Sequence, residues 1–89
     1  MIVARSKLFD KDYALIIKQG KDIELVNNLI LALSDGLPLD QRYRNHKLLG
    51  KYAECYECHV KPDLLLIYQI DKEDQILYLV RVGSHSRLF

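Results

Sequence analysis

The sequence contains no long run of apolar residues, and this absence excludes several classes of protein. No segment of the 89 residues approaches the roughly 20 consecutive apolar residues that a membrane-spanning helix requires. The N-terminal segment MIVARSKLFDKDYALIIKQG also lacks the apolar stretch of a secretory signal peptide. We therefore expect a cytoplasmic protein, and the length predicts one domain over residues 1–89 with a small hydrophobic core.

The sequence also has few cysteines, no nucleotide-binding motif and almost no net charge. The two cysteines are expected to be free thiols in a reducing compartment. The sequence has no P-loop, no GxGxxG motif and no serine nucleophile elbow. The formal net charge is only +1, so composition alone does not indicate a nucleic-acid-binding protein.

One segment is nevertheless strongly basic. It lies between Asp40 and Glu54, and its cationic side chains, with no acidic one among them, are Arg42, Arg44, Lys47 and Lys51. A local basic segment on a nearly neutral chain can guide a phosphate-bearing ligand. The alternative interpretation is a solvated loop without a ligand.

Hydrophobic periodicity predicts two helices in the first part of the chain. A short apolar run, MIVAR, is typical of a strand. Apolar residues then recur at spacings of three and four, which predicts a helical hairpin over residues 6–34. Ser6 and Asp22 can cap the two helices, and Gly20 can end the first.

The pattern changes to strands after an extended loop at residues 37–50. Three apolar and aromatic segments follow, at residues 51–60, 64–70 and 75–82, and the segments KPD and DKED between them suit hairpin turns. The predicted fold class is therefore α+β, with the two helices packed on one face of an antiparallel β-meander.

The hairpin register predicts where reactive side chains gather. If Ile70 pairs with Gln75, Arg81 lies across from Leu64 at the start of the middle strand. The KPD turn brings the preceding strand to the same end of the sheet. The groups expected at this end are His59, Asp63, Arg81 and, on the tail, His85 and Phe89.

The third histidine, His46, lies in the basic loop, so all three histidines of the chain could share one cleft. A single histidine is more often structural, but imidazole can give or take a proton near neutral pH. Arginine offers a fixed fork of donors for phosphate oxygens, and a terminal aromatic ring can stack on a base. Together these groups suit metal-free acid/base cleavage of a phosphodiester in RNA.

The cysteines form a CxxC motif, Cys55 to Cys58. Redox motifs of this kind work at a helix N-terminus, whereas this one falls in a predicted strand. Residues three apart on a strand point to opposite faces, so we do not expect the two sulfur atoms to meet. A zinc site that combines Cys58 with histidines is a further alternative, but no set of four ligands is evident.

Three segments, YRNHKLLGKY, ECHVKPDLLLIY and VRVGSHSRLF, resemble the YafQ-like branch of the RelE/ParE toxin superfamily, the toxins of bacterial type II toxin–antitoxin systems. The resemblance covers the chain from about Leu37 to Phe89, and the two helices agree only in pattern and length. It implies a RelE-like fold, in which a short N-terminal strand and a two-helix hairpin pack on a C-terminal antiparallel β-meander.

The resemblance implies a ribosome-dependent mRNA endonuclease that works by metal-independent acid/base catalysis and needs no cofactor. The family's catalytic positions fall on His46, His59, Asp63, Arg81, His85 and Phe89. The residues expected to bind RNA are Arg42, Arg44, Lys47, Lys51 and Lys61. His85 is the first candidate for proton transfer, with His59 or His46 as its partner. Arg81 would contact the scissile phosphate, while Arg87 has no matched role and is interpreted as a solvated side chain.

The chain departs from the family pattern at three positions. Tyr56 replaces an arginine of many relatives, Leu64 replaces a tryptophan, and Tyr52 stands in GKY where relatives have GxW. Tyr56 and Leu64 favour an alternative hypothesis, a non-catalytic or differently targeted toxin of the same fold, such as a gyrase poison.

The resemblance also implies a partner, a cognate RelB/DinJ-like antitoxin that wraps the toxin and covers the basic cleft or displaces a tail residue. The apolar outer surface of the helical hairpin is the expected docking site for an antitoxin helix. Such an interface would bury more than ~2,000 Å² in total. We expect a monomer when free, a heterotetramer or larger assembly with the antitoxin, mRNA on the ribosome as the substrate, and no membrane contact.

Overall fold

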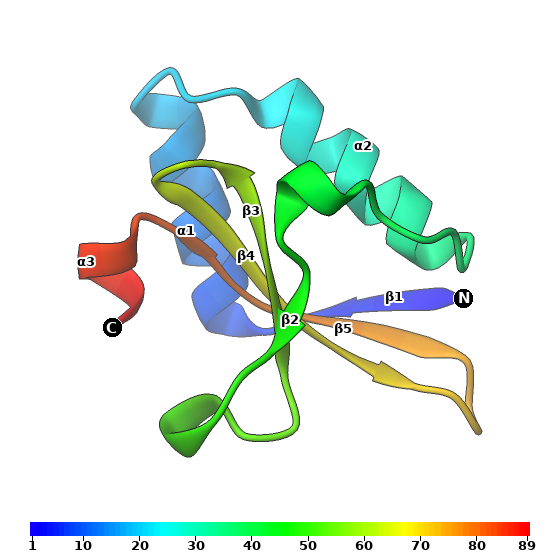
Figure 1. The fold of residues 1–89 in the computed structure, drawn as a ribbon. Helices are drawn as coiled ribbons and strands as arrows, with labels where there is room; N and C mark the ends of the chain where they lie inside the picture. Colours follow the sequence, from blue (N-terminus) through cyan, green and yellow to red (C-terminus); the bar gives the residue numbers. More distant parts are fainter.

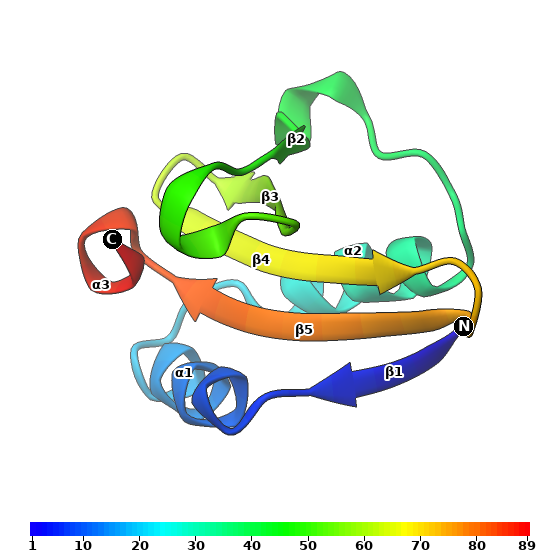
Figure 2. The same cartoon turned by 90° about the horizontal axis from the view of Figure 1, so that it is seen from below.

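The computed structural model describes residues 1–89 as an α+β fold, as predicted. Five strands form one mixed sheet in the order β1-β5-β4-β3-β2. The strands are β1 (Ile2–Arg5), β2 (His46–Lys47), β3 (Tyr56–Lys61), β4 (Leu64–Asp71) and β5 (Ile76–Gly83). The helices are α1 (Lys7–Lys18), α2 (Ile23–Ser34), α3 (His85–Leu88) and two 3-10 turns, η1 (Gln41–Tyr43) and η2 (Gly50–Tyr52). Figures 1 and 2 show α3 at the end of β5, away from the N-terminus.

The helical hairpin forms where the sequence predicts it. The Ser6 hydroxyl accepts a hydrogen bond from the Phe9 amide at 2.9 Å, and the Asp22 carboxylate accepts one from the Leu25 amide at 3.0 Å. These bonds satisfy amides that have no partner within the first turn of a helix. Gly20 lies just beyond α1 with a φ of 69°, a left-handed conformation that ends a helix at little cost in a residue without a Cβ.

The two faces of the sheet bury clusters of unequal size. Helices α1 and α2 cover one face, and a cluster of 13 buried residues fills the space between them and the sheet. The opposite face carries a cluster of 5 buried residues: Tyr52, Cys55, Leu65, Ile67 and Leu88. Tyr52 belongs to η2 and Leu88 to α3, so these two short elements cover part of the second face.

The CxxC motif divides between the two faces. Cys58 packs in the larger cluster and Cys55 in the smaller, as strand alternation predicts. Burial, together with the charge of Glu57, raises the pKa of the Cys58 thiol to about 12. A thiol in this state is no redox nucleophile.

The predicted register between β4 and β5 is wrong. Ile70 pairs with Leu77, and Arg81 pairs with Ile67 instead of Leu64. The turn is longer than expected because Gln75 adopts a left-handed conformation, with a φ of 55°. A bulge between Ile67 and Tyr68 then shifts the pairing once more.

The strand boundaries also differ from the prediction. The segment at residues 51–60 begins with η2, and the strand starts only at Tyr56, after Glu54 with a φ of 74°. The predicted loop at residues 37–50 contains η1 and the two-residue strand β2. Strand β1 pairs in parallel with β5 and so adds a fifth strand to the meander.

Candidate active site

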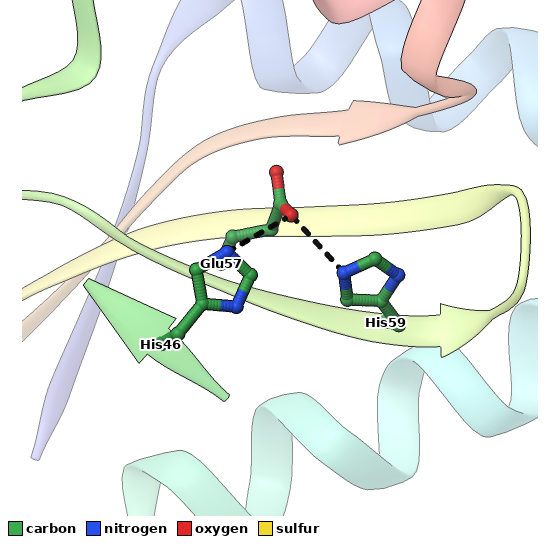
Figure 3. Close-up of side chains that lie close together, drawn as sticks. All are labelled: His46, Glu57 and His59. Carbon is green, nitrogen blue, oxygen red and sulfur yellow. Dashed lines mark ion pairs between the residues drawn. The ribbon is translucent and has the colours of Figure 1, made fainter. Parts of the chain in front are cut away.

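Two histidines and a glutamate form a close group on the sheet face opposite α1 and α2. His46 lies across from Glu57 in the β2–β3 pair, and His59 lies two residues after Glu57 on the same side of β3. The His46 Nε2 atom is 3.5 Å, and the His59 Nε2 atom 3.2 Å, from the same oxygen, Oε1, of Glu57 (Figure 3). The rings of the two histidines are 5.8 Å apart.

Glu57 is the residue of this group that the sequence analysis did not select. Its side chain is only 6% exposed, so the carboxylate is held inside the site and not in solvent. A buried carboxylate needs partners, and here they are the two imidazoles. The signal was present in the segment ECH, because a glutamate two residues before a histidine on a strand shares its face.

The group gives both imidazole rings a fixed orientation. The Nδ1 atom of His46 forms a hydrogen bond of 2.7 Å with the Arg44 carbonyl, and its Nε2 atom faces Glu57. His59 is only 21% exposed and also directs Nε2 toward Glu57. Glu57 therefore lies next to the Nε2 atoms of both rings, and positioned imidazoles are the groups that acid/base chemistry most often uses.

The same three side chains could hold a metal ion. The ligand atoms of His46, Glu57 and His59 all lie within 4.8 Å of one another. Imidazole nitrogen and carboxylate oxygen are ligands that Zn²⁺ and Cu²⁺ accept. The alternative set of Cys58 with histidines is wrong, because Cys58 is buried on the helix-covered face.

Three of the five residues expected to bind RNA lie beside His59. A pocket of about 340 Å³ is lined by Arg42, Arg44, His59 and Lys61, together with Tyr43, Val60 and Pro62. Lys47 instead lines a separate hollow that contains Tyr56 and Tyr68.

Some cations of the expected set also contact neighbouring side chains. Lys51 lies 5.4 Å from the centre of the Tyr52 ring. Lys61 also lies 3.8 Å from a carboxylate oxygen of Asp22. Arg42 likewise donates from Nη2 to the Tyr43 hydroxyl at 3.0 Å, and with Arg44 and Lys61 it supplies the positive charge next to His59.

The C-terminal tail is folded back as α3. The Asp63 carboxylate accepts a hydrogen bond of 3.0 Å from the His85 backbone amide. The His85 ring stacks on Phe89, with 4.9 Å between centroids and 27° between planes, and Phe89 meets the edge of Tyr52 at 5.4 Å. In this structure Asp63 therefore holds the tail backbone and does not contact an imidazole.

The strand register relates the tail to the histidine group. His59 pairs with Leu65, and Leu65 pairs with Gly83, so these residues form one row across β3, β4 and β5. Two strand spacings separate His59 from Gly83 by on the order of 10 Å. His85 follows Gly83 by two residues. The tail therefore starts at the same end of the sheet as His59.

Arg81 is held by a residue that the sequence analysis missed. It lies in the row of Glu57 and Ile67, one row behind His59. Its Nε atom donates to Oδ2 of Asp12 at 2.7 Å, and its Nη2 atom donates to Oδ1 at 3.0 Å. Burial alone would raise the pKa of the Asp12 carboxyl, but the hydrogen bonds and charge of Arg81, with further bonds from Val82 and Arg87, lower it.

Arg87 is not a freely solvated side chain. Its Nε atom donates to Oδ1 of Asp12 at 3.1 Å, so the tail is tied to α1 by an ion pair. The interpretation of Arg87 from the sequence was therefore wrong, because an aspartate 75 positions away leaves no local sequence signal.

No helix of the structure has both the length and the apolar character needed to cross a membrane.

Sequence comparison with known proteins identifies a family and several relatives. A family described as "Bacterial toxin of type II toxin-antitoxin system, YafQ" matches residues 1–89. The mRNA interferase toxin YafQ of Escherichia coli K12 is 35% identical over 82 residues, which cover 91% of this chain and 87% of that protein.

Solved structures extend this similarity to the fold. A metal-bound toxin from Helicobacter pylori is 45% identical, with a TM-score of 0.93 over 100% of this chain and 99% of the other. YafQ in the E. coli DinJ–YafQ complex is 34% identical, with a TM-score of 0.88 over 98% and 96%.

Proposed function

Because the chain belongs to the YafQ family of bacterial toxins of type II toxin–antitoxin systems, we propose that it is an mRNA interferase, an endoribonuclease that stops translation by cutting mRNA. The observation that carries this proposal is the pair of imidazoles, His46 and His59, fixed by Glu57 beside a pocket lined with arginines. The relative from E. coli that is named an mRNA interferase toxin supports it. We also propose that residues 1–89 act as one domain.

The proposed reaction is transfer of the phosphodiester to the neighbouring 2′ oxygen. A base removes the 2′-OH proton, the 2′ oxygen bonds to phosphorus, and the bond from phosphorus to the 5′ oxygen breaks as an acid protonates that oxygen. The products are a 2′,3′-cyclic phosphate and a 5′-OH end. The candidate proton-transfer groups are His85 and, on β3 and β2, His59 or His46.

The other site residues would bind and orient the RNA. Arg42, Arg44 and Lys61 would contact the backbone at the pocket next to His59. Phe89, which is 53% exposed and stacked on His85, offers a ring face to a base. Arg81 would stabilise the charge that develops on the phosphorus-bound oxygens.

We further propose that cleavage takes place on ribosome-bound mRNA, in the cytoplasm. The test is primer extension on a defined mRNA incubated with purified protein, with and without ribosomes. Discrete cleavage sites that need ribosomes are expected. Growth arrest in cells without any mRNA cleavage would instead favour a toxin of the same fold with another target.

We propose a DinJ-like antitoxin as the partner of this chain, on the model of the E. coli complex. The outer surface of α1 and α2 exposes Leu8, Ile17 and Leu31 to between 52% and 62%, and an amphipathic antitoxin helix would cover such side chains. Co-expression with the product of the adjacent reading frame, followed by light scattering, tests the partner. The co-expressed proteins are expected to form a heterotetramer or a larger assembly. The toxin alone is expected to be a monomer.

A second candidate property is metal binding by His46, Glu57 and His59. The toxin from Helicobacter pylori, which is described as metal-bound, and the spacing of these ligand atoms support it. A metal ion on the two Nε2 atoms would occupy the groups proposed for proton transfer. Titration calorimetry with Zn²⁺ and Cu²⁺ tests this property, and His59→Ala should abolish the binding while Lys72→Ala should not.

A further inference from the structure

Asp12 is a completely buried carboxylate in the middle of α1, with a relative exposure of 0%. It lies beside the edge of the sheet that β5 forms beyond the end of β1. Strand β1 pairs with β5 only as far as Leu79, so the edge of β5 beyond that point has no strand beside it. Oδ2 of Asp12 accepts a hydrogen bond of 3.2 Å from the Val82 amide and so takes the place of the missing strand.

The same carboxylate binds two arginines from different elements. Oδ2 and Oδ1 accept from Nε and Nη2 of Arg81 on β5, and Oδ1 also accepts from Nε of Arg87 on α3. Two positive charges and four hydrogen bonds compensate for the burial of one negative charge. Helix α1, strand β5 and the tail helix α3 therefore meet at one side chain.

These contacts leave Arg81 fixed but only partly occupied. A guanidinium has five N–H groups, and Asp12 accepts from Nε and Nη2. Tyr52 lies close enough to add to the effect of Asp12 in raising the pKa of Arg81. The N–H groups that Asp12 does not use are the ones we assign to a phosphate oxygen. The Arg81 side chain is 12% exposed, so little freedom remains for the guanidinium to turn away from that orientation.

The tail has few other anchors. Helix α3 is only four residues long, and a helix of this length has no independent stability. It is held by the burial of Leu88 and by the ring contact between Phe89 and Tyr52. Its polar anchors are the Tyr52 hydroxyl bond to the Leu88 carbonyl at 3.1 Å, the Asp63 bond to the His85 amide, and the ion pair of Arg87 with Asp12.

We propose that Asp12 is a positioning residue of the nuclease site: it orients Arg81 toward the scissile phosphate and, through Arg87, holds the tail so that His85 and Phe89 face the RNA. This inference rests on the proposed function, because it assigns Asp12 a part in the same cleavage. Asp12 acts through other residues and does not touch the substrate.

Arg87→Ala removes the contact between Asp12 and the tail and leaves the Asp12–Arg81 pair in place. The Arg87 side chain is 43% exposed, so its removal leaves no buried cavity. The matched control is Arg5→Ala, because Arg5 pairs with Asp10 of the same helix at 3.1 Å but both side chains are more than half exposed. Both variants are expected to melt near the wild-type temperature.

Activity on ribosome-bound mRNA should separate the two variants. Arg87→Ala should lower kcat by roughly 10–100-fold with little change in KM, because a displaced tail impairs chemistry more than binding. Arg5→Ala should leave both constants unchanged. Arg87→Lys, which restores a cation able to reach Asp12, should recover part of kcat. Asp12→Asn should lower kcat at least as much as Arg87→Ala, and the double variant should be no worse than Asp12→Asn alone.

An Arg87→Ala variant with wild-type kcat would overturn the proposal. So would a double variant whose loss in kcat is the product of the two single losses. An Arg87→Lys variant with no higher kcat than Arg87→Ala would overturn it as well. Hydrogen exchange of the Phe89 amide, which donates to the His85 carbonyl at 3.0 Å, gives a readout independent of activity. It should be faster in Arg87→Ala than in Arg5→Ala. If the wild type cuts no RNA, the proposed function fails, and unchanged exchange at Phe89 would separately refute the anchoring role of Asp12.

Discussion

The two faces of the sheet differ in what they bury and in what they leave open. On the face under α1 and α2, 13 buried residues form a continuous apolar layer. On the other face, 5 buried residues share the surface with two histidines, a buried glutamate and a folded tail. The face under the helices holds most of the buried apolar side chains, and the other face holds the side chains that we propose for the chemistry. In that proposal Asp12, on α1, connects the two through Arg81 and Arg87.

The largest effect is expected when the tail is removed. Deletion of residues 85–89 takes away His85, Phe89 and the buried Leu88, so cleavage of ribosome-bound mRNA should be lost entirely. Loss of the buried Leu88 should also lower the free energy of unfolding, though by less than the roughly 2–5 kcal/mol typical of a leucine in a large core. Binding of the antitoxin along α1 and α2 should persist, as measured by co-purification. A truncated protein that still cuts mRNA would contradict the assignment of the chemistry to this face.

The next effect isolates one imidazole. His85→Ala should lower the cleavage rate by roughly 10²–10⁴ if His85 transfers a proton, and leave the melting temperature nearly unchanged. Ser86→Ala is the control, since Ser86 is the exposed neighbour of His85 in the same turn. Single-turnover cleavage and thermal unfolding measure the two quantities. Full activity of His85→Ala would remove it from the catalytic set.

Paired leucine variants compare the faces directly. Leu66, with 0% exposure in the larger cluster, and Leu88, with 1% in the smaller, lose the same atoms on substitution by alanine. Leu66→Ala should lower the free energy of unfolding by about 2–5 kcal/mol and keep the kcat of the folded fraction. Leu88→Ala should cost less stability but lower kcat, because it loosens the tail. Urea unfolding and steady-state kinetics check both, and the reverse ranking would show that the faces are not divided in this way.

The smallest effect concerns pH and the link between the faces. The folded-state pKa of Asp12 lies below the ordinary value of 3.8. Its contribution to stability is therefore fully present above that value and is lost as the pH falls through the lower folded-state pKa. The difference in unfolding free energy between the wild type and Asp12→Asn should shrink from about pH 5 to about pH 2, measured by urea unfolding. A difference that stays constant over this range would mean that the carboxylate is not the stabilising group.

Local signals predicted much of the fold. Ser6 and Asp22 cap the helices as expected, the hairpin packs on one face, and Cys55 and Cys58 divide between the faces. Each of these features depends on residues close in the sequence, where spacing alone decides the geometry.

The features that could not be predicted depend on distant partners or on single backbone angles. The left-handed Gln75 and the bulge near Tyr68 shifted Arg81 from Leu64 to Ile67. Asp12 and Glu57 are charged residues that a periodicity analysis assigns to solvent, yet both are buried. Asp12 is paired with an arginine 69 positions away, a distance over which a sequence pattern carries no information.

The parallel pairing of β1 with β5 also has a consequence for the order of events during synthesis. Ile2 lies beside Ile76, so the first strand has no neighbour in the sheet until the segment that contains Ile76 has been made. Contacts between such distant segments form slowly, because a long loop must close first. The nascent chain is therefore expected to complete the β1 edge of its sheet only after β5 has been made, and the α3 tail, which follows β5 directly, folds in the same late step.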